Sequence, residues 1–183
     1  IEVPTPVDRP VVEFQLPPTT VLSLDMSDLL LDLQSYPHLS AKHKLTIIEA
    51  IQSASKQFDI NPLILYSIIH VESSFRWWLV HATPSTKDKE PALGLGGIRP
   101  SVWGDQLKSA NIIQVKADLF DISANIHAIA YVYDQLRSDP MHKSATNHDM
   151  SAMLKYFGGD YIEYFNRVNS KIIQLTQHRL YKD

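Results

Sequence analysis

A single acidic side chain stands at the end of an almost wholly apolar segment. Glu72 follows the run Leu63–Val71 and precedes a glycine-rich turn, Gly94-Leu95-Gly96-Gly97-Ile98. Poor solvation and the negative end of a helix dipole both favour the protonated form of a carboxyl group. An acid that keeps its proton near pH 7 can donate it, which is what the cleavage of a glycosidic bond requires. Glu72 is therefore the first candidate for a catalytic residue.

A helix with clear boundaries positions this carboxyl group. Asn61 is a favourable N-cap, and Pro62 supplies the φ angle preferred at the first helical position. From Pro62 to Ser73 almost no polar face remains, and a helix that is apolar all round is normally buried. We therefore expect a buried central helix over residues 62–73.

Helical periodicity extends along most of the chain. Apolar residues recur at helical spacing in further segments, with helices expected over 26–34, 40–59, 100–107, 121–138, 150–157 and from Asp160 onward. Residues 77–97 lack such periodicity, and because long loops in compact domains are often functional, we place one wall of a groove there. Without a convincing run of alternating strand residues, the predicted fold class is all-α or helix-dominated.

The chain divides by composition near residue 40. Five prolines lie within residues 1–24, which indicates a stiff tether or a segment draped over the domain. We assign residues 1–40 to a proline-rich N-terminal extension with a short helix, whose leucines indicate docking, and residues 41–183 to one domain. The start at Ile1 rather than at methionine indicates a processed or trimmed chain.

Composition excludes several classes of function. The net charge of -3 and the lack of a dense lysine or arginine run argue against a nucleic-acid partner. Cysteine is absent, so neither disulfides nor thiol chemistry is expected. The longest apolar stretch is shorter than the about 20 residues that cross a bilayer.

Metal and nucleotide sites are not expected either. The eight histidines are scattered without the spacing of metal ligands. No lysine and hydroxyl residue follow the glycines of the turn in the register of a phosphate-binding loop. We therefore predict no metal and no cofactor.

Four short motifs, taken together, resemble the soluble lytic transglycosylase domain. The family pattern is an apolar helix ending in Glu-Ser-x-Phe, a Gly-Leu-Met-Gln-Ile-x-Pro turn, an Asn-Ile helix and an Ala-Tyr-Asn-x-Gly segment. This chain has Glu72-Ser73-Ser74-Phe75, Gly94-Leu95-Gly96-Gly97-Ile98-Arg99-Pro100, Asn125-Ile126 and Lys155-Tyr156-Phe157-Gly158-Gly159. Each motif alone is common, and their order carries the resemblance, which covers residues 42–170.

The resemblance implies a lysozyme-like fold that cleaves bacterial peptidoglycan without a cofactor. Glu72 would be the general acid and base, and Tyr156 would polarise the reaction centre beside it. We expect the glycan strand to be bound by side chains and backbone groups of Ser73, Ser74, Phe75, Gly97, Ile98 and Tyr131. At least one of Trp77, Trp78 and Trp103 is a further candidate for stacking on a sugar ring.

The glycine-rich turn and the tyrosine segment both depart from the family pattern. Gly96-Gly97 replaces Met-Gln, and Phe157 replaces the asparagine that follows the tyrosine. The missing glutamine removes one polar contact to a sugar, while glycine lets a glycan approach the backbone more closely. These differences indicate a divergent branch with altered contacts to substrate.

The reaction implied by the resemblance needs only one carboxyl group. Glu72 would protonate the oxygen that leaves C1 of N-acetylmuramic acid, and would then take the proton of the C6 hydroxyl as it closes on C1, giving a 1,6-anhydro sugar. A goose-type lysozyme-like hydrolase is the alternative, and it usually needs a second carboxylate, about 5 to 5.5 Å or about 6.5 to 9.5 Å away. Asp88, Glu90 and Asp105 are candidates for that group.

A non-catalytic alternative also remains. A glycan-binding or assembly module could keep the groove and lose turnover, which Gly97 and Phe157 make plausible. In each case the expected setting is the bacterial periplasm or cell envelope. The N-terminal extension would join the domain to a larger protein or envelope complex, or would pack as a permanent flank.

Overall fold

The computed structural model describes residues 26–81, 90–138, 156 and 161–180. These residues form a helix-dominated fold whose β-structure is one two-stranded hairpin, so the predicted all-α class is confirmed. The predicted tether over residues 1–24 and most of the predicted helix over 150–157 lie outside the described residues.

The two helices at the centre begin and end where their sequence signals predict. Helix α2 spans Ala41–Phe58, and the Ser40 hydroxyl accepts a hydrogen bond from the backbone N–H of His43. Helix α3 spans Pro62–Ser73, and the side chain of Asn61 accepts from the backbone N–H of Leu63. Eight of the twelve residues of α3 are buried, so it is the buried central helix that its composition indicates.

The N-terminal helix docks on the body of the molecule, as its leucines predict. Helix α1 spans Met26–Asp32 and continues into a 3-10 turn, η1, at Leu33–Ser35. Leu29 and Leu33 have no exposed surface and belong to the same hydrophobic core as α2 and α3.

The segment expected to lack regular structure contains a short hairpin. Strand β1, Val80–His81, pairs antiparallel with strand β2, Ala92–Leu93, with Val80 opposite Leu93 and His81 opposite Ala92. The expectation of no strand here was wrong, because two-residue strands are too short to show an alternating pattern. The hairpin leads into the glycine-rich turn at 94–98, where Leu93 and Ile98 form a further bridge.

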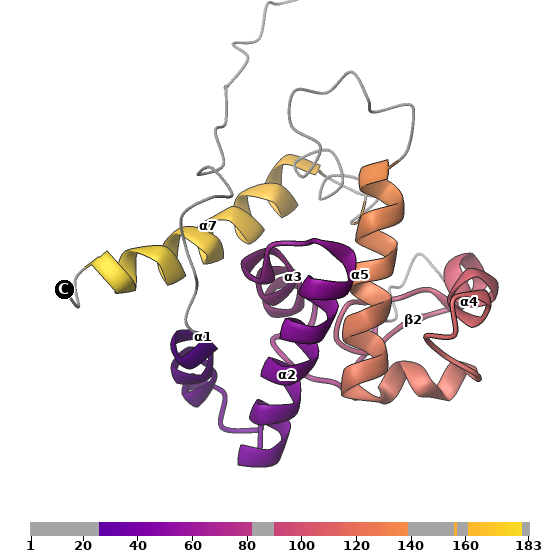
Figure 1. Cartoon of the computed structure of the whole chain (residues 1–183), viewed down its shortest axis with the longest axis horizontal. Helices are drawn as coiled ribbons and strands as arrows, with labels where there is room; N and C mark the ends of the chain where they lie inside the picture. The colour runs from indigo at the N-terminus through magenta and orange to yellow at the C-terminus, as the bar shows by residue number, and fades with distance from the viewer. Residues whose placement is uncertain (1–25, 82–89, 139–155, 157–160, 181–183) are drawn as a thin grey trace, which may run out of the picture.

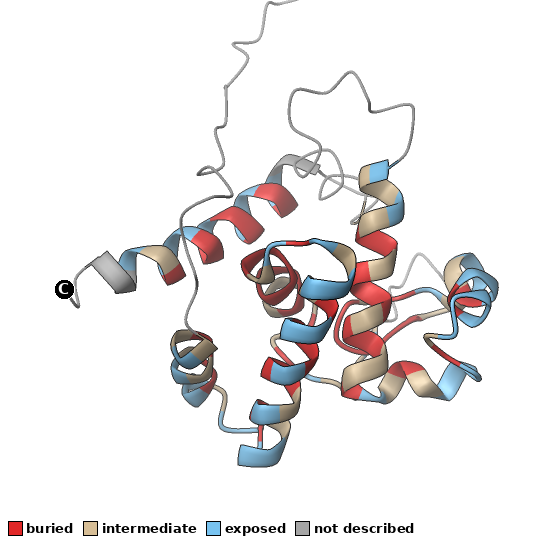
Figure 2. Ribbon diagram, in the orientation of Figure 1, coloured by how far each residue is buried: buried red, intermediate tan, exposed pale blue. Residues whose placement is uncertain are grey.

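The remaining elements cover α2 and α3 from two sides (Figure 1). Helix α4 spans Pro100–Ser109, the 3-10 helix η3 spans Lys116–Phe120, helix α5 spans Ile122–Ser138 and helix α7 spans Tyr161–Leu180. Helix α5 packs chiefly against α2, whereas α7 packs chiefly against α3. The apolar stripe of each of these two helices faces the core, as Figure 2 shows for the buried residues. Glu72 thus lies near the junction of α3, α7 and the hairpin.

Candidate functional site

Glu72 occupies the last turn of α3 and is half-buried. Burial raises the pKa of its carboxyl group from 4.5 to about 7, because a charge is poorly solvated there. A hydrogen bond with Tyr164 and the positive charge of Arg167 act in the opposite direction and lower the pKa. Since burial is the largest effect, a substantial fraction of Glu72 holds its proton at neutral pH.

Tyr164 and Arg167 come from α7, and sequence reasoning did not select either of them as a site residue. The buried Tyr164 hydroxyl has a raised pKa, first because of burial and then because of the Glu72 charge, so it keeps its proton beside the carboxyl group. Arg167 also donates to the backbone carbonyl of Val71, over 3.3 Å. In the sequence, the only feature that connects these two residues is their one-turn spacing on a predicted helix. The same spacing is equally typical of a core aromatic residue that neighbours a charged surface residue.

Gly97 lies directly against the Glu72 carboxyl group. Its φ of +60° is in the left-handed region, and a Cβ added there would be 3.1 Å from Glu72 Oε2. The same Cβ position is 3.5 Å from Nδ1 and Cε1 of His81, so the imidazole also lies close to Gly97. A glycine is needed at this position both for the backbone conformation and for the space.

Tyr156 contacts the same turn, at the neighbouring glycine. Its hydroxyl donates a hydrogen bond of 2.9 Å to the carbonyl of Gly96. Burial raises the pKa of Tyr156 well above its usual value, and the charge of Glu72 raises it further, which places the phenol within electrostatic reach of the acid. The structure thus brings Glu72, Gly97 and Tyr156 together as the motifs predict.

Asn125 fixes the turn to α5 through three hydrogen bonds made by a buried side chain. Its Oδ1 accepts from the backbone N–H of Gly96 at 3.0 Å. Its Nδ2 donates to the carbonyls of Leu93, at 3.2 Å, and Leu119, at 2.7 Å. The asparagine of the Asn-Ile motif therefore has a positioning role, because it sets the backbone on which Gly97 sits.

Three of the other predicted substrate-binding residues are buried. Ser73 and Phe75 have no exposed surface; the Ser73 hydroxyl donates to the carbonyl of Ile69, and the ring of Phe75 packs on Tyr36. The N–H and carbonyl of the buried Ile98 are both hydrogen-bonded to Leu93. This burial does not support the predicted contact of these three residues with substrate.

Ser74 and Tyr131 are partly exposed. Ser74 ends α3 in a left-handed conformation, with its hydroxyl directed at the carbonyl of His70. Tyr131 packs edge-on against Phe58 at the end of α2, and none of its described contacts reaches Glu72. Of the adjacent tryptophans, Trp77 is partly buried and Trp78 is 45% exposed.

No second carboxylate is found beside Glu72 among the residues described. Glu90 forms an ion pair with Lys116, and Asp105 is exposed on α4. Asp88 lies outside the described residues. The titratable side chain that shares the surroundings of Gly97 with the Glu72 carboxyl group is His81, which sequence reasoning passed over as one of eight scattered histidines.

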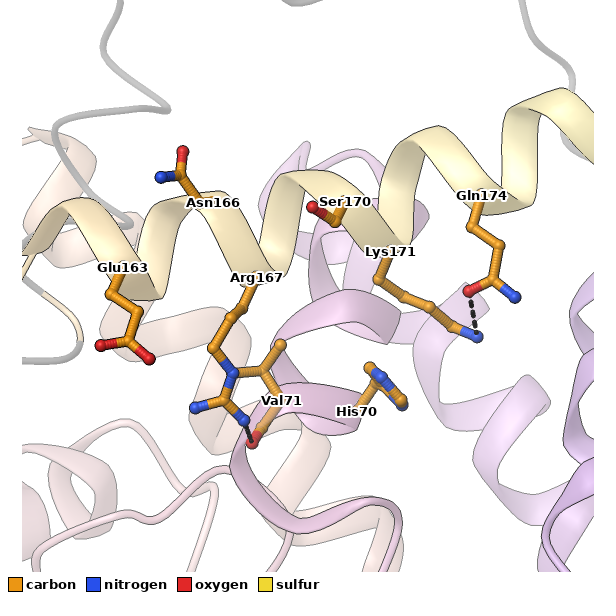
Figure 3. A pocket seen from close by; sticks show the side chains of 8 residues that line it. All are labelled: His70, Val71, Glu163, Asn166, Arg167, Ser170, Lys171 and Gln174. Carbon is orange, nitrogen blue, oxygen red and sulfur yellow. Dashed lines mark hydrogen bonds between the residues drawn. The ribbon is translucent and has the colours of Figure 1, made fainter.

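A separate cavity of about 360 Å³ lies on the α7 side of α3. Figure 3 shows Arg167 reaching from α7 to Val71 at the end of α3, while the Lys171 amine turns toward Gln174; His70 also lines the cavity. Lys171 already pairs with Asp32, at 2.8 Å. The Glu72 side chain does not line this cavity, which adjoins the acid only through Arg167 and Val71.

The described residues contain neither a metal-binding cluster nor a membrane-spanning helix. Within that part of the chain, no cluster of three or more histidine, cysteine or acidic side chains is arranged to hold a metal ion. In the same residues, no helix combines the length and the apolar character that a membrane span requires.

In comparisons with known proteins, no family model, curated protein or solved structure matches the chain significantly. A functional assignment must therefore rest on the residues and geometry of the site itself.

Proposed function

We propose that this protein is a peptidoglycan lytic transglycosylase with a lysozyme-like fold, and that Glu72 is its general acid and base. The observation that carries the proposal is the raised pKa of Glu72, about 7, at a position beside the glycine-rich turn and Tyr156. A carboxyl group with this pKa can both donate and accept a proton near neutral pH. The order of the four motifs supports the choice of substrate.

In the proposed reaction Glu72 protonates the oxygen that leaves C1 of N-acetylmuramic acid. The resulting carboxylate then receives a proton as the C6 hydroxyl closes on C1, and the product is a 1,6-anhydro sugar. Tyr164 and Arg167 stabilise the carboxylate that forms, by a hydrogen bond and by charge. Tyr156 holds the carbonyl of Gly96, and with it the backbone next to the reaction centre.

The two glycines that replace the family Met-Gln are compatible with this reaction. The Cβ of a larger residue at position 97 would crowd the proton-donating oxygen of Glu72. Without that side chain, the sugar can come closer to the acid than a glutamine would allow.

The proposed partner is a glycan strand of peptidoglycan, and the proposed setting is the bacterial periplasm or cell envelope.

The test is fragment release from purified sacculi by the wild type and by Glu72→Gln, with mass analysis of the products. We expect anhydro-ended muropeptides from the wild type and a loss of at least about 100-fold in the variant, as for removal of a general acid. Glu163→Gln on α7 is the matched control, because Glu163 is exposed and lines the separate cavity.

Other results would assign the site differently. Reducing ends in place of anhydro ends indicate a hydrolase. Sacculus binding without fragment release from the wild type contradicts the enzymatic proposal and favours a glycan-binding module.

A further inference from the structure

His81 is held by β1 in a defined tautomer. Its Nε2 lies 2.8 Å from the carbonyl oxygen of Gly94. A carbonyl can only accept a hydrogen bond, so Nε2 carries the proton and the Nδ1 of the neutral ring has a free lone pair. The imidazole is thereby anchored through one nitrogen and available through the other.

The available nitrogen lies in the neighbourhood of the acid. Nδ1 of His81 and Oε2 of Glu72 lie 3.5 Å and 3.1 Å from the same point, the position of a Cβ on Gly97. Because Gly97 has no side chain, nothing of that residue fills the space between the two groups. A ligand group that packs on Gly97 therefore lies close to both of them.

The two groups have complementary protonation states. Burial, followed by the Arg76 charge, lowers the pKa of His81, against the opposing effect of its bond to Gly94. Burial raises the pKa of Glu72 to about 7, against Tyr164 and Arg167. Near neutral pH an uncharged base thus lies near an acid of which a substantial fraction is protonated, a pairing that supports proton transfer in both directions.

We propose that Nδ1 of His81 accepts the proton of the oxygen that attacks C1 of the sugar, which makes His81 a second catalytic residue. This inference rests on the function proposed above and divides the two proton transfers between two groups. The C1–O4 bond breaks as Glu72 gives its proton to O4, and the C6 oxygen bonds to C1 as its proton passes to Nδ1. The imidazolium then returns a proton to the Glu72 carboxylate through solvent, and the site is restored.

Glutamine is the informative substitution, because its amide nitrogen reaches the place of Nε2. His81→Gln keeps a donor for Gly94 and removes the lone pair at Nδ1. We expect kcat on sacculi to fall about 100-fold, in the range for a lost general base, with unchanged sacculus binding and Tm.

The control is His127→Gln, which alters a histidine that is also bonded to a backbone carbonyl, that of Ser123 at 2.8 Å, on α5. We expect its kcat to equal that of the wild type. A kcat of His81→Gln within threefold of the wild type overturns the proposal, and so does a loss that the control shares.

A second measurement covers the case in which His81→Gln folds poorly. Nitrogen-15 NMR of the histidine rings should report the Nε2–H tautomer for His81 and a change in its pKa in Glu72→Gln. A ring with the proton on Nδ1, or one that does not respond to Glu72→Gln, overturns the proposal without any activity assay.

The two proposals fail in different ways. A wild-type protein that releases no fragments refutes the transglycosylase function and this step with it. Fragment release that is lost in Glu72→Gln but kept in His81→Gln refutes the role of His81 alone.

Discussion

At the scale of single residues, the site depends on how poorly Glu72 is solvated. Burial is the largest effect on its pKa, and the donors from α7 reduce that effect without cancelling it. A poorly solvated site that also offers a hydrogen bond holds the pKa of the carboxyl group near 7. This pKa is the condition for donating and then accepting a proton near neutral pH. The same balance makes Glu72 a cost to stability whenever it is charged.

Glu72→Gln should therefore stabilise the protein at high pH. Because the folded-state pKa of about 7 lies above the value of 4.5 expected on unfolding, the stability linked to this proton is complete below pH 4.5 and is lost as pH rises through 7. Above pH 7 the variant should be more stable than the wild type by about 1 to 3 kcal/mol, and below pH 4.5 the two should be equal. Urea unfolding at pH 4 and pH 8 measures both values, and a gain that is the same at both pH values contradicts the explanation.

Tyr164→Phe should move the alkaline limb of the pH–activity profile. The hydrogen bond from Tyr164 lowers the pKa of Glu72, so its removal raises that pKa and the acid keeps its proton to higher pH. In the wild type, kcat/KM should fall as pH rises through about 7, and in the variant the fall should come later. Tyr36→Phe is the control, because its hydroxyl bonds to His70 instead; an unmoved limb in Tyr164→Phe rules out the assigned contact.

Glu72 was predictable from sequence because an acid in an apolar helix is a local anomaly. Tyr164, Arg167 and His81 were not, since each of them belongs to an ordinary local pattern and gains its role only through contacts between distant segments. The three-dimensional arrangement, rather than residue type, selects His81 from the eight histidines.

At the scale of elements, the turn at 94–98 depends on α5. Asn125 Oδ1 and Nδ2 satisfy one backbone N–H and two carbonyls in a buried place. Each group left without its partner would cost about 1 to 3 kcal/mol.

Asn125→Ala should therefore lower the free energy of unfolding by about 3 kcal/mol or more and reduce activity by loosening the turn. Thermal or urea unfolding and sacculus cleavage measure the two effects. Asn166→Ala, at an exposed position on α7, is the matched control and should change neither. A stability loss below about 1 kcal/mol contradicts the role assigned to Asn125.

Element boundaries were predicted well wherever a cap stands in the sequence. Ser40, Asn61 and Asp121 each accept a backbone hydrogen bond at the start of a helix, as expected. The hairpin and the 3-10 helix η3 were missed, because both are too short to have a period. The hairpin is held by pairing between its strands, and η3 by local hydrogen bonds to the Asp118 carboxylate.

At the scale of the whole molecule, one partly buried carboxylate joins three helices. Asp32 at the end of α1 accepts from the Tyr66 hydroxyl of α3, at 2.6 Å, and from Lys171 Nζ of α7, at 2.9 Å. The Lys171 side chain is only 5% exposed, so its charge has little contact with water.

Asp32→Ala should lower the free energy of unfolding by about 3 to 5 kcal/mol, because it leaves the Lys171 charge buried without its partner. Asp134→Ala is the control. It removes a more exposed ion pair with Arg137 and should cost at most about 1 kcal/mol. Equal losses in urea unfolding would contradict a special role for Asp32.

The origin of the groups around Glu72 has a consequence during biosynthesis. The acid is made with α3, whereas Tyr164 and Arg167 are made with α7, long after α3 has left the ribosome. An incomplete chain without α7 lacks these stabilising groups and the cover that this helix provides on α3. A nascent or truncated form thus lacks the two groups that lower the pKa of Glu72, and the proposed proton donor is complete only once the late helix has docked.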